Sequence, residues 1–293
     1  MMQTPDIGRM ILERTGDAHE IEIPFGDLLK IRPLQLPTGW IVNVGGTPID
    51  LSPTRNVVFL LVAAFLVWLT LWLTGRALTR QRERGGGAAA PRGFANMVEA
   101  VVLFVRNDVA IASIGHKNGA KFAPYILTLF WFILYCNLLG LVPYGEKPTG
   151  SFWVTGALAL TALLTIEISG FVTLGAKGYL KTIVFTPPGT TGITAVLLTL
   201  IMTPIEIIGK LVKPFALMLR LFANMAAGHF VMLSLLSLIF LFGNIAYFRW
   251  AIAGGSVVFV LFMMAIELLV AFIQAYVFAL LTSTFIGLMQ HEH

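Results

Sequence analysis

The sequence has too little charge for a soluble domain of its length. Only 12% of its 293 residues are Asp, Glu, Lys or Arg, whereas 57% are hydrophobic. A soluble globular chain carries about 25% charged residues, so roughly half of the usual solvating charge is missing. The same figures exclude an intrinsically disordered chain, which needs low hydrophobicity and high charge. The composition therefore predicts a multi-pass membrane protein.

Cysteine is scarcer still, and its scarcity excludes further classes. The one cysteine, Cys136, lies inside an apolar run. A single thiol provides neither a disulfide framework nor, by itself, a metal site. The net charge of +5 does not indicate nucleic-acid binding, because the basic residues are spread over loops between apolar runs and report membrane orientation instead. We expect no metal, no cofactor and no nucleic-acid partner.

Five apolar runs are long enough to cross a bilayer, whose hydrocarbon core takes about 20 helical residues. They are residues 56–75, 122–142, 152–174, 190–242 and 250–289. The last two are too long for one upright crossing, since about 40 to 50 helical residues extend roughly 60 to 75 Å. We favour one long, oblique helix for each over two helices joined by a re-entrant turn. The predicted fold is all-α and polytopic, with about five crossings.

Loop charges predict the orientation. Residues 1–55 hold seven acids against five bases, a net charge of −2, while residues 76–92 hold five arginines against one acid. Because positively charged loops stay in the cytoplasm, the N terminus is expected outside and the C terminus, after five crossings, inside. Residues 1–55 are expected to form an extramembrane, periplasmic segment and residues 56–293 the membrane domain. Residues 93–115 have apolar positions at helical spacing and predict an amphipathic helix at the cytoplasmic interface.

Ionisable residues at membrane depth are costly, so each one in an apolar run is a candidate functional residue. These residues are Glu167, Glu206, Lys210, Lys213, Arg220, His229 and Glu267. A structural interpretation stays open for three of them. Lys210 and Lys213 lie near a proline and fit side chains that snorkel towards an interface, and Glu167 fits a protonated carboxyl bonded to a neighbouring helix.

Arg220 differs from the others because its guanidinium stays charged at any physiological pH. No acid lies one helical turn away, where the chain has Ala216, Leu217, Ala223 and Asn224. Further small residues at 226–228 would let another helix approach the backbone. A cation displayed among small residues suits a partner that carries a carboxylate. The alternative is a structural ion pair with Glu206 or Glu267.

Polar residues recur along one face in each of the two long runs. In the first of these runs they are Glu206, Lys210, Lys213, Arg220 and Asn224, at helical spacing. In the last run, Glu267 and Gln274 are two turns apart. Two such faces would line a hydrated path if they met; for Gln274 the alternative is a hydrogen bond between helices.

The segment 219–229, LRLFANMAAGH, resembles the signature of subunit a of the rotary F-type ATP synthase, the stationary proton-channel subunit of the membrane sector. The resemblance extends to NLLGLVP at 137–143, PIE at 204–206 and QAYVF at 274–278, and covers residues 56 to the end. It implies that Arg220 faces the ring of c subunits and meets their proton-carrying carboxylates, with two offset aqueous half-channels leading to it. Matching positions near the arginine or along those half-channels are Asn224, Glu206, His229, Glu267 and Gln274.

The resemblance also implies the setting in which the chain works. The partners would be the c-ring, b-type peripheral stalk subunits, other ATP synthase subunits and the lipid bilayer, in a bacterial plasma (inner) membrane. Proton translocation would be coupled to ATP synthesis elsewhere in the complex, since nothing here resembles a phosphate-binding glycine loop. A transporter acting alone would be expected to show paired repeats, which the sequence lacks, and a scaffold would have little reason to keep Arg220.

Two residues depart from the family pattern. Ala223 stands where the family usually has glycine. His229 and Glu267 are exchanged relative to the enterobacterial type, which has glutamate at the first position and histidine at the second. Because the exchange retains one acid and one imidazole, it predicts that His229 and Glu267 interact in space.

Overall fold

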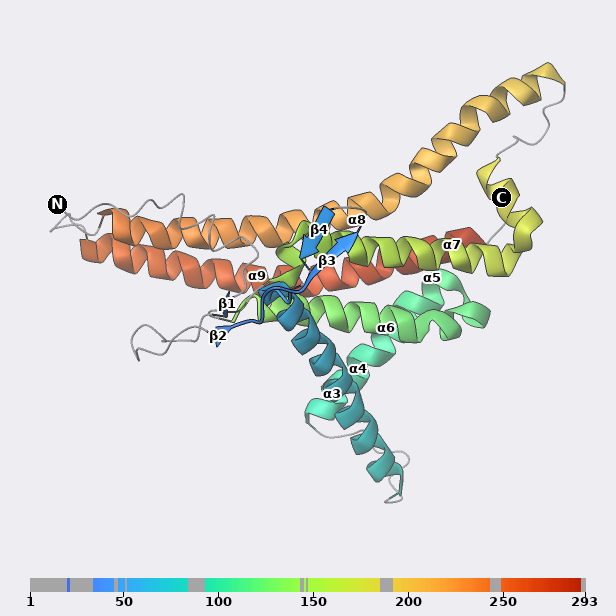
Figure 1. The fold of residues 1–293 in the computed structure, drawn as a ribbon. Coiled ribbons are helices and arrows are strands. Elements are labelled where there is room, and N and C mark those ends of the chain that lie inside the picture. Colours follow the sequence, from blue (N-terminus) through green and yellow to red (C-terminus); the bar gives the residue numbers. More distant parts are fainter. Residues whose placement is uncertain are drawn as a thin grey trace. The chain divides into compact units, whose positions relative to one another are not determined.

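The computed structural model describes residues 20–21, 34–44, 47–50, 52–83, 93–142, 145, 147–184, 192–242 and 249–290. Helices make up most of this described part (Figure 1). They are α3 (Arg55–Glu83), α4 (Phe94–Phe104), α5 (Ala112–Ile114), α6 (His116–Leu139), α7 (Phe152–Ile183), α8 (Ile193–Phe242) and α9 (Arg249–Gln290), with a π-helix η1 (Val105–Ile111) and a 3₁₀ turn η2 (Pro148–Gly150). The predicted helical architecture of the membrane part is confirmed.

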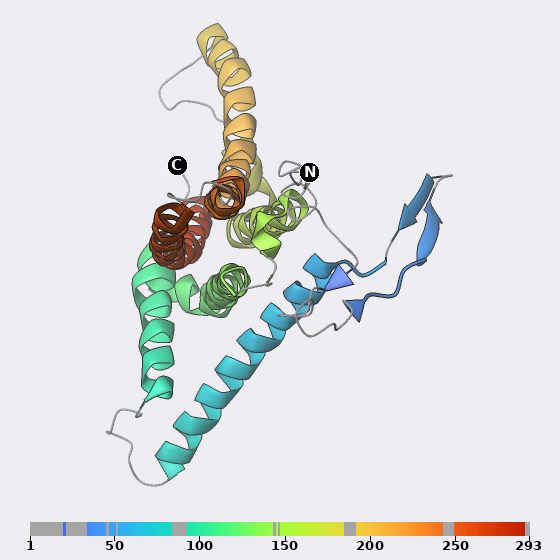
Figure 2. The same cartoon turned by 90° about the vertical axis from the view of Figure 1, so that its left-hand side faces the viewer.

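Four of the five predicted crossings coincide with helices that are long and apolar enough to span a membrane. These are Arg55–Arg80, His116–Leu139, Phe152–Ile183 and Gly254–Gln290. The remaining predicted crossing falls within α8. Helices are the expected solution because the bilayer core offers no water to hydrogen-bond with the backbone, so every N–H and C=O must be satisfied inside the segment. The first of these helices, α3, runs unbroken along its length (Figure 2).

The two long runs each form one helix, as predicted. α8 has 50 residues and α9 has 42. α8 continues through Pro204 and Pro214, although each proline removes one backbone hydrogen bond. At 1.5 Å per residue the two helices extend about 60 to 75 Å, far more than the hydrocarbon core of about 30 Å. No re-entrant turn divides either helix.

Short strands precede the first long helix. β1 (Glu20–Ile21) pairs with β2 (Leu34–Gln35), and β3 (Ile41–Val44) pairs with β4 (Thr47–Asp50), both antiparallel. The Ser52 hydroxyl accepts hydrogen bonds from the backbone N–H groups of Gly39 and Trp40, with N···O distances of 2.9 and 3.2 Å. These strands all lie in the segment expected outside the membrane, and the sequence analysis did not foresee them.

The predicted amphipathic segment is helical but not uniformly α-helical. Its middle, Val105–Ile111, is a π-helix between α4 and α5. One side is buried through Val98, Val105, Val109, Ala110 and Ile114, while Phe94, Met97, Leu103 and Phe104 are exposed. A π-turn leaves backbone carbonyls without their usual helical donors, and the Ser283 hydroxyl of α9 donates to the Val109 carbonyl at 3.1 Å. The predicted position of this segment at the cytoplasmic interface stays a prediction.

Contacts divide the chain into two compact units, which are described separately below. Unit 1 comprises residues 1–66, 134–151 and 222–273, and unit 2 comprises residues 67–133, 152–221 and 274–293. Both long C-terminal helices therefore contribute to each unit. The predicted boundary at residue 55 concerns the position of the membrane and stays a prediction.

Candidate functional site

Arg220 lies in the part of α8 that belongs to unit 2, and its side chain is exposed. Leu217 and Leu221, on either side of it, are buried, so the helix turns its apolar side inward and its arginine outward. In the described residues of this unit Arg220 forms no ion pair, so pairing with Glu206, which lies half-buried in the same helix, is not realised.

The exposed side of α8 around Arg220 carries small residues. Along the helix Leu217, Leu221 and Met225 are buried, each four residues after the last. The exposed positions between and beside them are Ala216, Leu219, Arg220, Ala223, Asn224 and Ala227. Helical periodicity therefore places a cation among three alanines on the side away from the core. Such a surface allows close approach of another helix, as the sequence analysis predicted.

A second group of predicted residues is linked within unit 2. The Lys210 ammonium donates to the Thr182 hydroxyl at 3.0 Å and lies 5.1 Å from the centre of the Tyr179 ring. The Tyr179 hydroxyl donates to Glu167 Oε2 at 2.5 Å. Twelve residues of straight helix would separate Tyr179 from Glu167 by about 18 Å. Gly175, with φ 70° and ψ 173°, kinks α7 between them and brings the tyrosine back to the carboxylate.

Lys213, the other lysine near Pro214, lies 5.4 Å from the Phe285 ring centre. Lys210 and Glu167 thus have specific partners, and the snorkelling interpretation of the two lysines stays open.

Glu267 has a partner that the sequence analysis missed. It is buried in α9, with 8% of its surface exposed, and the Lys147 ammonium donates to both carboxylate oxygens at 2.9 and 3.0 Å. Lys147 itself is 4% exposed. It follows α6 in a segment outside the apolar runs, so neither hydropathy nor helical spacing marked it as a site residue.

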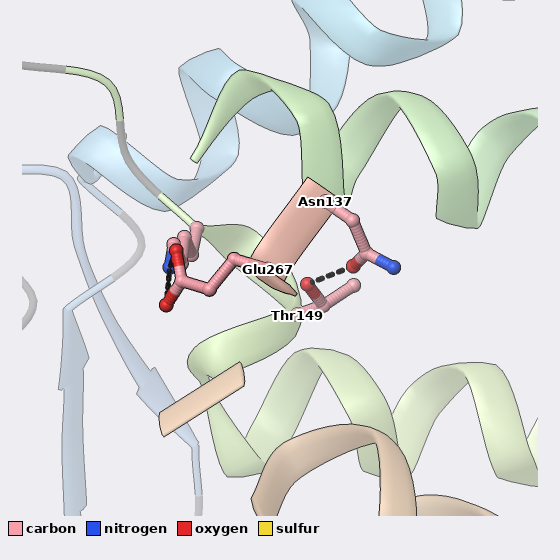
Figure 3. Close-up of polar contacts among 4 residues, drawn as sticks. Asn137, Thr149 and Glu267 are labelled. Carbon is pink, nitrogen blue, oxygen red and sulfur yellow. Dashed lines mark hydrogen bonds and ion pairs between the residues drawn. The ribbon is translucent and has the colours of Figure 1, made fainter. Parts of the chain in front are cut away.

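The segment that carries Lys147 is tied to two helices of unit 1 (Figure 3). The Thr149 hydroxyl donates to Asn137 Oδ1 at 2.6 Å, and the Asn137 side-chain amide donates to the Ala271 carbonyl at 3.3 Å. Asn137 and Thr149 are both fully buried. Asn137 belongs to the NLLGLVP motif of α6, and Ala271 lies one turn after Glu267. These bonds fix the turn η2 to α6 and α9.

Two glycines make room for the pair. A Cβ on Gly140 would lie 1.8 Å from Lys147 Cγ, and a Cβ on Gly228 would lie 2.1 Å from Glu267 Oε1. Any larger residue at either position would collide with the paired side chains. Gly228 therefore brings α8 against the Glu267 carboxylate, one residue before His229.

The remaining predicted site residues are placed as follows. The backbone of His229 lies in α8, but its side chain lies outside the described residues, so its pairing with Glu267 stays a prediction. Gln274 is buried in the part of α9 that belongs to unit 2. In the described part of the chain, no group of three or more His, Cys, Asp or Glu side chains is placed to hold a metal ion.

The close approach at Gly228 leads to a stability prediction. Gly228→Ala is expected to destabilise the protein by about 1–3 kcal/mol, because the new methyl group displaces a carboxylate held by two hydrogen bonds. Gly209→Ala is the matched control, since it lies in the same helix with nothing within 4 Å of the new Cβ. That change should be neutral or stabilising by up to about 1 kcal/mol. The thermal stability of the two purified variants checks this, and equal melting temperatures would contradict it.

These features define a multi-pass helical membrane protein with a buried ion pair and an exposed arginine on a long helix. Residues 56–287 match the family model described as ATP synthase A chain. The chain is 42% identical over 278 residues to ATP synthase subunit a of Chloroherpeton thalassium, covering 94% of this chain and 75% of that protein. It is 44% identical over 249 residues to that of Myxococcus xanthus, covering 84% and 76%.

A further relative is ATP synthase subunit a of Anaeromyxobacter dehalogenans, 41% identical over 301 residues that cover 96% of this chain and 70% of the relative. The chain belongs to the ATP synthase subunit a family. It is accordingly a multi-pass subunit of the membrane sector of an ATP synthase, and the alternatives of a lone transporter and of a scaffold are set aside.

Proposed function

We propose that the chain is the stationary proton-channel subunit of its complex, with Arg220 at the interface with a ring of c subunits. The observation that supports this most directly is the exposure of Arg220 among alanines on α8, opposite a buried apolar face. A charge so placed at membrane depth needs a partner that comes from outside the chain. A carboxylate on a passing helix meets that need, and the small residues leave it space.

The chemistry follows from a cation that cannot lose its proton. A fixed guanidinium favours the ionised form of an arriving carboxylate, so the carboxylate releases its proton into the exit path. The same cation repels protons and so prevents a direct leak between the two half-channels. Each ring carboxylate must then take up another proton before it enters lipid, because the charged form is too costly there. Uptake on one side and release on the other give rotation its direction.

Contacts within each unit suggest which side of the membrane each polar group serves. Glu267 is paired with Lys147, which lies in the loop expected outside. Lys210 contacts Thr182, near the end of α7 that is expected in the cytoplasm, and Glu206 lies one turn from Lys210. We therefore assign Glu267, with His229 as its proposed partner, to the outer half-channel and Glu206 to the inner one. Asn224 and Gln274 complete the path near the arginine.

The proposal extends to the lipid, the partner subunits and the membrane that surround the chain. Large apolar side chains are exposed along both long helices, among them Leu200, Leu211, Leu261 and Leu269. They suit contact with lipid or with the apolar helices of a c-ring. The family resemblance adds b-type peripheral stalk subunits as partners. We place the protein in a bacterial plasma (inner) membrane, with its N terminus outside and its C terminus in the cytoplasm.

Access of water tests the half-channels. After removal of Cys136, cysteines at Glu206, Asn224 and Gln274 are expected to react quickly with a water-soluble thiol reagent added to one side of the membrane. Cysteines at Leu221 and Phe278, which are fully buried in apolar surroundings, are the controls and should react slowly. Labelling of the assembled complex in vesicles, followed by mass spectrometry, gives the rates. Similar rates at all five positions would contradict a defined channel.

A further inference from the structure

We propose that Lys147 is a positioning residue for proton transfer at Glu267, fixing the direction of this carboxylate through two hydrogen bonds between transfers. The inference rests on the proposed function, because it gives Lys147 a part in the outer half-channel. Nothing in the NLLGLVP, PIE, LRLFANMAAGH or QAYVF motifs includes this lysine.

The geometry of the pair supports more than a chance surface contact. Both oxygens of Glu267 accept hydrogen bonds from the one ammonium, and both side chains are almost completely buried. Ion pairs at exposed positions contribute little and rarely hold one arrangement. In a buried site, by contrast, a carboxylate and an ammonium stabilise one another's charged forms strongly, and neither has water as a substitute.

The protein backbone is built to present this lysine. Gly140 leaves the space that the Lys147 stem fills, and the turn η2 that follows Lys147 is fastened through Thr149 and Asn137 to the carbonyl of Ala271. The lysine is thus anchored to α9 one turn beyond the carboxylate that it binds. Because its anchor is independent of the ion pair, Lys147 keeps its place when Glu267 changes protonation.

This arrangement determines how a proton reaches Glu267. Each oxygen of Glu267 accepts one hydrogen bond from Lys147 and keeps a second lone pair, so a proton can reach the carboxylate from the side that does not face the ammonium. The carboxylate lies against α8 at Gly228, one residue before His229. Lys147 therefore restores the orientation of the Glu267 carboxylate after each transfer and directs it towards α8. Loss of the ammonium would leave a buried carboxyl without the two hydrogen bonds that fix its direction.

The test uses the complete ATP synthase in inverted membrane vesicles, with ATP-driven proton uptake measured by a pH-sensitive dye and normalised to assembled complex. Lys147→Met, which keeps the length of the side chain and removes its charge, should reduce the pumping rate about tenfold or more, since misplaced transfer groups cost rate steeply. Lys147→Arg should restore most of the rate because it also binds a carboxylate with two hydrogen bonds. Lys177→Met, at an exposed lysine of α7, is the matched control and should pump normally.

A chemical readout separates positioning from mere packing. A hydrophobic carbodiimide takes the proton of a buried neutral carboxyl onto its nitrogen, and the carboxylate oxygen adds to its central carbon. Rearrangement leaves an N-acylurea with the mass of the whole reagent added. Mass spectrometry of the Glu267 peptide should show no adduct in the wild type or in Lys147→Arg, and an adduct in Lys147→Met. If Lys147→Met does not assemble, Lys147→Gln takes its place with the same expected results.

Normal pumping in the uncharged Lys147 variants, or an unlabelled Glu267 in them, would overturn the inference. The outcome is distinguishable from failure of the proposed function. Pumping that persists in Arg220→Ala contradicts the proposed function itself, whereas loss in Arg220→Ala together with normal pumping in Lys147→Met overturns only the role of Lys147.

Discussion

Replacing Arg220 with alanine is expected to abolish both ATP-driven proton pumping and ATP synthesis while leaving insertion and assembly intact. The side chain is exposed and contributes nothing to the core formed by Leu217 and Leu221, so its removal has little effect on packing. Loss of a charge at membrane depth also removes a cost of insertion. What disappears is the fixed cation that a partner carboxylate would meet. Dye quenching in inverted vesicles and synthesis driven by an imposed proton gradient measure the two activities.

A conservative change at the same position sharpens this experiment. Arg220→Lys is expected to lose most of the activity as well, because an ammonium can give up its proton and lacks the planar fork of the guanidinium. Leu200→Ala serves as the control, since Leu200 is exposed on the same helix 20 residues away. Coupled synthesis at the wild-type rate in Arg220→Ala would show that the assignment of Arg220 is wrong.

The helices were predictable because the bilayer leaves the backbone few choices. An apolar run that must satisfy its own hydrogen bonds becomes a helix, although α3 and α7 continue beyond the predicted runs 56–75 and 152–174, to Glu83 and Ile183. For the same reason α8 continues through Pro204 and Pro214, where a soluble helix would break. Details that depend on single backbone angles were not predictable from composition. They include the π-helix after Phe104 and the kink at Gly175.

Only those parts of the candidate site that lie within a single helix were predictable from the spacing of residues. Arg220 and the small residues beside it lie on one helix, so periodicity alone predicted the face that the structure exposes. Glu267 was predicted to interact with His229, because the two positions together retain one acid and one imidazole. Its partner Lys147 lies 120 residues earlier in the chain, in a polar segment. A contact over that separation leaves no mark in the local pattern, and only the fold brings the two charges together.

Variants of the buried pair formed by Lys147 and Glu267 should also be much less stable than the wild type when only one of the two residues is changed. Glu267→Gln leaves the Lys147 ammonium buried without its counter-charge, and Lys147→Met leaves the Glu267 carboxyl buried without its hydrogen-bond donor. Breaking a buried ion pair by removing one partner costs about 3–5 kcal/mol. Removing both charges, as in Lys147→Met with Glu267→Gln, leaves no charge to strand, so the double variant should melt closer to the wild type than either single variant does.

The four proteins are compared as assembled complexes by the temperature at which the membrane sector dissociates, with Lys177→Met as a control that should melt like the wild type. If the two single losses simply add in the double variant, the charges do not interact, and the contact between Lys147 and Glu267 is not what stabilises this region. The double variant also separates stability from transport. It should assemble well and still fail to pump, because a glutamine at 267 has no carboxylate to carry a proton through the outer half-channel.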